Sequence, residues 1–176
     1  VWGVPADSLP GPGVPALELL DLLGDEVHAL LVHGSNVVVS APDADSATQR
    51  LGRLQLLVVC DFFLSETAQL ADVVLPVTQW AEEEGTMTSL EGRVLRRRRA
   101  LAAPAGARSE LWIMSELARR LDAPGTWSTD PAEVFDELAL ASEGGPADYS
   151  GLSHELLDTG LTAQWPFPRG SRGTPR

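Results

Sequence analysis

The stretch Gln55-Leu56-Leu57-Val58-Val59-Cys60, followed directly by Asp61, decides the fold class. Its side chains are almost all apolar, and a strand that is apolar on both faces is typical of a covered parallel sheet. Residues 27–33 and 73–75 form two further short apolar runs, while residues 43–54 and 65–71 between the runs favour helices. This alternation predicts an α/β fold with a doubly wound, mostly parallel sheet and flanking helices.

The chain divides into three parts around this pattern. Residues 1–13, rich in Gly and Pro, predict an extended entry, and residues 14–122 hold the α/β domain. Residues 123–176 predict one helix and then an extended linker towards a missing C-terminal domain, because Gly, Pro and Ser dominate from residue 142 onward. The sequence begins without Met and both ends read as cut, so we expect an incomplete domain of a larger protein.

Three further segments of the chain have distinct patterns. Residues 15–23 and 109–121 carry apolar side chains at helical spacing and predict two helices. Residues 77–92 have no clear period and predict a long loop, which is uncommon in a compact domain unless it has a function. Ser65 is expected to cap the short helix that follows it, with Glu66 placed favourably against the helix dipole.

Composition excludes several classes of function. The formal net charge is −12 and all 13 basic residues are Arg, so the chain lacks the basic face that a nucleic-acid partner requires. Cys60 is the only cysteine, which excludes an internal disulfide and a cysteine metal cluster within this chain. No apolar run approaches the roughly 20 residues that cross a bilayer, so no membrane span is expected.

Gly34-Ser35-Asn36 leaves the first strand at its carboxyl end, where parallel sheets bind their ligands. Gly permits close approach of the backbone, and Ser and Asn can hydrogen-bond phosphate or sugar oxygens. The alternative is a tight turn without a ligand.

Asp61 ends the second strand at the same edge of the sheet. Its two carboxylate oxygens match the two parallel donors of guanine, N1–H and N2–H, and such charge-assisted pairs are strong. The alternative is that Asp61 caps the turn into Phe62 and Phe63. Cys60, inside the apolar strand, is expected in the core.

Several charged residues permit two interpretations each. The triplet Glu82-Glu83-Glu84 can bind a hard cation or lie in a solvated loop, and the run 96–99 of arginines can meet a pyrophosphate or face solvent. Glu110 is explained by the dipole of the helix that it begins. The three histidines have no ligand-like spacing, and no motif supplies a complete reaction, so we expect no catalytic and no metal-ligating residue in this chain.

Taken in order, these segments resemble the molybdopterin oxidoreductases that bind the bis(molybdopterin guanine dinucleotide) cofactor. The resemblance is strongest to the assimilatory nitrate reductase branch, followed by formate dehydrogenases. It rests on the following segments: Gly34-Ser35-Asn36 with Ser40, residues 58–67, residues 71–76, Glu82-Glu83-Glu84-Gly85-Thr86, Glu91-Gly92-Arg93-Val94, Leu111-Trp112, Trp165-Pro166 and residues 173–176.

The resemblance implies a site and a cofactor. It places Gly34, Ser35, Asn36, Cys60, Asp61, Glu83 and Glu110 at one guanine-dinucleotide arm of a molybdenum-bis(molybdopterin guanine dinucleotide), with Asp61 reading guanine. Three positions depart from the family pattern: Glu83 replaces a Lys of some nitrate reductases, Ser89 an Asn, and Gly92 an Arg.

The resemblance also implies a larger cytoplasmic enzyme, in which this chain is inactive by itself. An iron–sulfur cluster, the molybdenum ligand and a C-terminal cofactor domain would belong to the remaining domains of the parent chain, which would receive electrons from a donor protein or domain. The expected reaction is nitrate reduction, with formate oxidation by a formate dehydrogenase as the second candidate. Two further hypotheses are the large iron–sulfur subunit of a respiratory NADH dehydrogenase, with a vestigial pocket, and a free-standing nucleotide-binding module.

Overall fold

A computed structural model describes residues 11–171, which form two compact units. The parallel unit contains residues 11–79 and 103–110, and the antiparallel unit contains residues 80–102 and 111–171. The domain expected over residues 14–122 is therefore divided between the two units. Of the expected extended entry, residues 1–10 lie outside the described residues, as do residues 172–176 at the other end.

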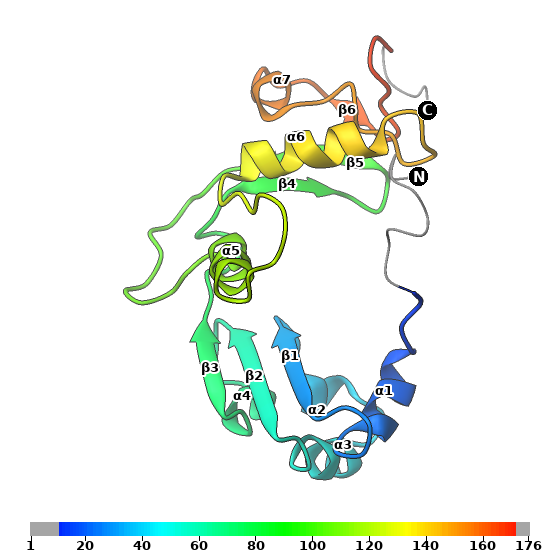
Figure 1. Ribbon diagram of the computed structural model, residues 1–176. Coiled ribbons are helices and arrows are strands. Elements are labelled where there is room, and N and C mark those ends of the chain that lie inside the picture. The colour runs from blue at the N-terminus through cyan, green and yellow to red at the C-terminus, as the bar shows by residue number, and fades with distance from the viewer. Residues whose placement is uncertain (1–10, 172–176) are drawn as a thin grey trace. The chain divides into compact units, whose positions relative to one another are not determined.

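The parallel unit is built on three strands in the order β1-β2-β3, all parallel (Figure 1). They are β1 (Ala29–His33), β2 (Leu56–Asp61) and β3 (Val73–Pro76). The helices are α1 (Ala16–Leu22), α2 (Val37–Ser40), α3 (Ala44–Leu51) and α4 (Glu66–Gln69). This arrangement confirms the expected α/β fold with a parallel sheet and flanking helices.

The helices that connect the strands lie together because the strand order runs in one direction. Right-handed crossovers then put both connections on the same face of the sheet, and the Val38 N–H of α2 donates to Thr67 Oγ1 of α4 at 3.0 Å. The core beneath them consists of Leu23, Val32, Leu51, Leu57, Val59 and Ala68.

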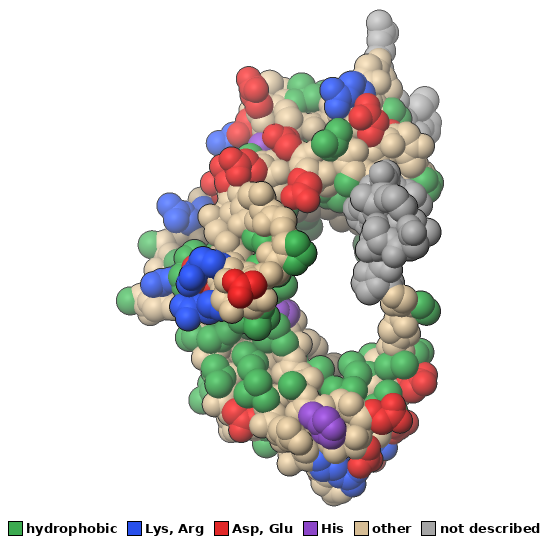
Figure 2. All heavy atoms as spheres, viewed as in Figure 1, with side chains coloured by type: hydrophobic (Ala, Val, Ile, Leu, Met, Phe, Trp, Pro, Cys, Tyr) green, Lys and Arg blue, Asp and Glu red, His purple; other side chains and the backbone are tan. Residues whose placement is uncertain are grey.

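Side chains of the opposite sheet face remain accessible. Side chains alternate between the faces of a strand, and Leu31, Leu56 and Val73 on this other face are 39%, 42% and 42% exposed. Hydrophobic side chains gather over the parallel unit in Figure 2.

The antiparallel unit contains β4 (Gly85–Thr88), β5 (Arg93–Arg97) and β6 (Ala163–Gln164), in the order β4-β5-β6. Its helices are α6 (Pro131–Ser142), α7 (His154–Asp158) and most of α5 (Glu110–Arg120), whose first residue belongs to the parallel unit. The core consists of Val94, Phe135, Leu152, Leu157, Ala163 and Phe167.

The expectation of a loop over residues 77–92 is wrong, because β4 lies within it and pairs with β5. The Ser89 N–H donates to the Arg93 carbonyl at 2.8 Å, and Gly92 turns the chain with a φ of 80°. Gly85–Thr88 is a strand because it forms antiparallel hydrogen bonds with β5. The segment itself is only weakly apolar, so its own sequence does not indicate this pairing.

The expectation of an extended linker from residue 142 onward is also wrong for the described residues. Helix α7 and strand β6 lie in this segment, and β6 pairs with β5. Leu152, Leu157 and Phe167 are almost fully buried. These three buried residues have no regular spacing and are surrounded by Gly and Pro. The sequence pattern therefore did not indicate that the segment is packed.

Candidate functional site

The candidate site lies at the carboxyl edge of the parallel sheet. His33 pairs with Cys60 and Asp61 with Pro76, so the strands end at nearly the same level. The Gly34 N–H donates to the Cys60 carbonyl at 2.8 Å and closes the turn after β1. Gly34 has a φ of 53°, and a Cβ built on it would meet no atom within 4 Å. The turn therefore needs glycine for its left-handed backbone, and the space beside it is open.

Asn36 joins the loops that follow β1 and β2. Its Oδ1 accepts from Thr67 Oγ1 at 2.9 Å and from Thr67 N–H at 3.3 Å. Its Nδ2 donates to Glu66 Oε2 at 2.6 Å. Thr67 is fully buried, so this contact holds the Gly34-Ser35-Asn36 turn against α4. Sequence analysis did not identify this role of Thr67, which depends on a partner 31 residues away.

Asp61 caps the turn that follows β2. Its Oδ1 accepts from the N–H groups of Phe62 and Phe63 at 2.8 and 3.4 Å, and its Oδ2 accepts from Ser65 Oγ at 2.7 Å. Of the two interpretations of Asp61, the cap is thus present in the structure. A carboxylate offers about four acceptor positions, so one on Oδ2 is left for a ligand.

Cys60 and Glu110 lie on the other side of the sheet edge from the Asp61 side chain. Successive side chains of a strand point to opposite faces, and Cys60 is completely buried. Burial raises the pKa of the Cys60 thiol, and the negative charge of Glu110 raises it further. Glu110 Oε1 lies 3.4 Å from His33 Nδ1. His33 therefore joins this group, and its place at the end of the first strand was the signal in the sequence.

Glu83 lies in the antiparallel unit, in an ion pair with Arg97 at 2.9 Å. The register of β4 and β5 pairs Gly85 with Arg97, which brings the acidic triplet beside the arginine run. Arg96 contacts Glu84 at 2.6 Å and Asp158 at 3.3 Å. Ion pairs within the unit thus neutralise much of the acidic triplet, which could have bound a cation, and of the arginine run, which could have bound a pyrophosphate.

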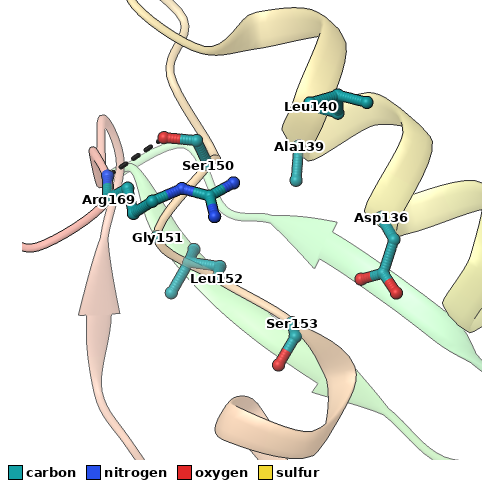
Figure 3. Close-up of a pocket in the computed structure, with 8 residues that line it drawn as sticks. All are labelled: Asp136, Ala139, Leu140, Ser150, Gly151, Leu152, Ser153 and Arg169. Carbon is teal, nitrogen blue, oxygen red and sulfur yellow. Dashed lines mark hydrogen bonds between the residues drawn. The ribbon is translucent and has the colours of Figure 1, made fainter.

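A shallow pocket of about 320 Å³ lies in the antiparallel unit between α6 and residues 150–153 (Figure 3). Asp136 and Arg169 bring opposite charges to its lining, and the Arg169 backbone N–H donates to Ser150 Oγ at 3.0 Å. Arg169 also contacts Glu143 at 3.3 Å. None of the residues expected from the sequence lines this pocket.

Metal-binding clusters and membrane-spanning helices are both absent from residues 11–171. These residues hold no cluster of three or more His, Cys, Asp or Glu side chains with the arrangement of a metal site. In the same range, none of the helices combines the length and the apolar character needed to span a membrane.

The sequence model of the molybdopterin oxidoreductase family matches residues 7–120, which is most of the chain. The chain belongs to this family. The match includes all seven expected site residues, from Gly34 to Glu110, and the three strands of the parallel sheet.

The relatives of this chain in the molybdopterin oxidoreductase family include assimilatory nitrate reductases and a formate dehydrogenase. The assimilatory nitrate reductase catalytic subunit of Bacillus subtilis is 41% identical over 100% of this chain and 25% of its own length. The assimilatory nitrate reductase of Haloferax mediterranei is 39% identical over 95% of this chain and 23% of its own. The F420-dependent formate dehydrogenase 2 subunit alpha of Methanococcus maripaludis is 39% identical over 88% of this chain and 22% of its own length. The chain spans about a quarter of the length of these relatives.

Among solved structures, the acetylene hydratase of Pelobacter acetylenicus has a similar fold. The TM-score is 0.69 with 23% sequence identity, and the similarity covers 88% of this chain and 22% of that one. This similarity supports the fold described above for this chain.

Proposed function

We propose that this chain binds one guanine-dinucleotide arm of a molybdenum-bis(molybdopterin guanine dinucleotide) cofactor. The observation that carries the proposal is the carboxyl edge of the parallel sheet. There the turn after β1 and the carboxylate at the end of β2 meet in register, and open α/β sheets bind ligands at this edge.

The residues present fit the nucleoside end of such an arm. Asp61 has an acceptor position left on Oδ2, and the Glu66 carboxylate is exposed. Guanine offers N1–H and N2–H donors, and the ribose offers hydroxyl donors, so an edge rich in acceptors is complementary to them. Gly34 leaves open space beside this edge.

The proposed role of the chain is to position the cofactor. When bound, the molybdenum group supplies the two-electron and oxygen-atom chemistry, and the protein contributes orientation and electrostatics. Asp61 would hold a guanine N–H, and Asn36 would fix the turn against which the nucleoside rests. Glu110, paired with His33, would place a negative charge beside Cys60 on the second side of the edge. Glu83 would contact the cofactor only by leaving its ion pair with Arg97.

We further propose that the whole protein reduces nitrate in the cytoplasm. The two assimilatory nitrate reductases among the relatives support this assignment. An iron–sulfur cluster and an electron-donor protein would then be contributed outside this segment. Formate oxidation is the second candidate, since the formate dehydrogenase of Methanococcus maripaludis is 39% identical over 88% of this chain.

The test is to purify the full-length parent and measure its molybdenum, its guanine nucleotide after acid release, and its turnover of nitrate and of formate. We expect bound molybdenum, released guanine nucleotide and nitrate turnover with a reduced dye. Formate oxidation without nitrate reduction would replace the reaction but keep the cofactor role. A parent purified without molybdenum and guanine nucleotide, from cells that load other molybdenum enzymes, would refute the cofactor role.

A further inference from the structure

Two carboxylates lie at the end of β2 and in the helix start that follows it, and they differ in how many hydrogen bonds they accept from the protein. Asp61 is 8% exposed and accepts from Phe62, Phe63 and Ser65. Glu66 is exposed, and its side chain accepts from Asn36 Nδ2 and from its own backbone N–H. A ligand that needs a strong acceptor therefore meets Glu66 more readily than Asp61.

The contact with Asn36 gives the Glu66 carboxylate a defined place and charge. The hydrogen bond of 2.6 Å engages Oε2, while Asn36 is itself held by the buried Thr67 through two further bonds. The bond from Asn36 is the main cause that lowers the pKa of the Glu66 carboxyl. The side chain is therefore anionic at neutral pH, and it is exposed to solvent.

We propose that Glu66 is a specificity-determining residue of the site, whose carboxylate accepts hydrogen bonds from the ribose hydroxyls of the bound nucleotide. The proposal rests on the proposed binding of a guanine nucleotide at this edge. An acidic side chain beyond the second strand of a βαβ unit is well placed for ribose hydroxyls, as in dinucleotide-binding sheets. With Asp61 largely committed to its turn, Glu66 is the more accessible of these two carboxylates.

The experiment compares two nucleotides on the cofactor-free full-length parent, produced in cells that cannot make molybdopterin. The probes are guanosine monophosphate and 2′,3′-dideoxyguanosine monophosphate, which has the same base and phosphate but no ribose hydroxyls. The variant is Glu66→Gln, which can still accept from Asn36 but loses the charge. The matched control is Glu26→Gln, an exposed carboxyl before β1 at the opposite edge of the sheet.

The wild-type protein and the control should bind guanosine monophosphate about tenfold more tightly than the dideoxy nucleotide, as expected for a charge-assisted hydrogen bond. Glu66→Gln should lose most of this preference and bind the dideoxy nucleotide as wild type does. An undiminished preference in Glu66→Gln, or no preference in the wild type, would overturn the assignment of Glu66. Either of these two results would leave the proposed binding of a guanine nucleotide standing. A wild-type protein that binds neither nucleotide would instead contradict the proposed function itself.

Discussion

Replacement of Asp61 by Asn separates its two possible roles, the cap of a turn and the contact to guanine. In Asp61→Asn the remaining carbonyl oxygen still accepts from Phe62 and Phe63 N–H. The new NH₂ group takes the place of Oδ2, 2.7 Å from Ser65 Oγ. A hydroxyl can rotate and accept instead of donate, so Ser65 adapts to the change.

The two roles predict effects of different size. As a cap, Asn is about equal to Asp, so the free energy of unfolding should change by less than about 0.5 kcal/mol. As a guanine contact, the variant presents an N–H donor where the base also presents one, and it loses the charge. A hydrogen bond to a charged group contributes about 1.5–3 kcal/mol. Cofactor affinity should therefore fall by at least about tenfold, because about 1.4 kcal/mol corresponds to one decade.

The assay measures molybdenum and guanine nucleotide per purified full-length protein after dialysis, together with the thermal unfolding curve. The matched control is Asp43→Asn, because Asp43 caps α3 by accepting from Ser46 N–H at 2.9 Å and plays no part in the proposed site. We expect the control to retain the cofactor and Asp61→Asn to lose it, with both proteins folded. Full cofactor retention by Asp61→Asn would refute the guanine contact and leave Asp61 as a cap alone.

Four further outcomes are expected. Thr67→Val leaves the Val38 N–H without its partner and Asn36 Oδ1 with the Thr67 N–H alone, so it should destabilise the chain by about 1–3 kcal/mol in urea unfolding, whereas Thr67→Ser should not. Burial lowers the pKa of His154, so the unfolded chain binds its proton first. Stability should fall as pH drops from the ordinary histidine pKa towards the lower folded value, and His154→Phe should remove this dependence. The buried Cys60 thiol, whose pKa is raised, should resist alkylation until the chain unfolds. The isolated 176-residue chain should turn over neither nitrate nor formate in a dye-linked assay, and measurable turnover by the metal-analysed chain would contradict this.

The parallel sheet and the starts of several helices in both units could be predicted because their signals are local. The apolar run that becomes β2 ends at Asp61 as expected, and the cap residues Ser65 and Asp130 each accept a hydrogen bond from a backbone N–H of the helix that follows. Pro131 begins α6, where its missing N–H costs nothing. These features depend on residues within one or two turns of chain, so the sequence alone carries them.

The sheet of the antiparallel unit could not be predicted because its strands pair with segments that are distant in the sequence. Strand β4 is stabilised by pairing with β5, and β6 reaches the same sheet from about 70 residues further along the chain. Arg96 illustrates the same limit for charges: its contacts are Glu84, 12 residues before it, and Asp158, far beyond it. A run of arginines in sequence gives no sign of which carboxylates it will meet.

The sequence predicted where the candidate residues lie on the sheet, but not which of their atoms remain available. Sequence order places Asn36 and Asp61 at one edge, but which atoms remain available for a ligand depends on the turns that the same side chains stabilise. Asp61 is largely committed to its turn, and Asn36 to Thr67 and Glu66. This commitment shifts the exposed negative charge to Glu66, a residue whose sequence context indicated only a helix start.

The charge of the edge also constrains how a nucleotide can lie on it. Exposed carboxylate oxygens attract the hydroxyl and N–H donors of a nucleoside but repel a pyrophosphate, whose charge must be compensated by donors. Arg96 and Arg97, in the densest positive segment of the chain, are paired with Glu84, Asp158 and Glu83. With the nucleoside against Glu66, we therefore expect the pyrophosphate to point away from this edge, towards donors supplied by backbone N–H groups or by polypeptide beyond this segment. Under the proposed function, charge complementarity thus favours the nucleoside end of the arm, and not its pyrophosphate, at the parallel unit.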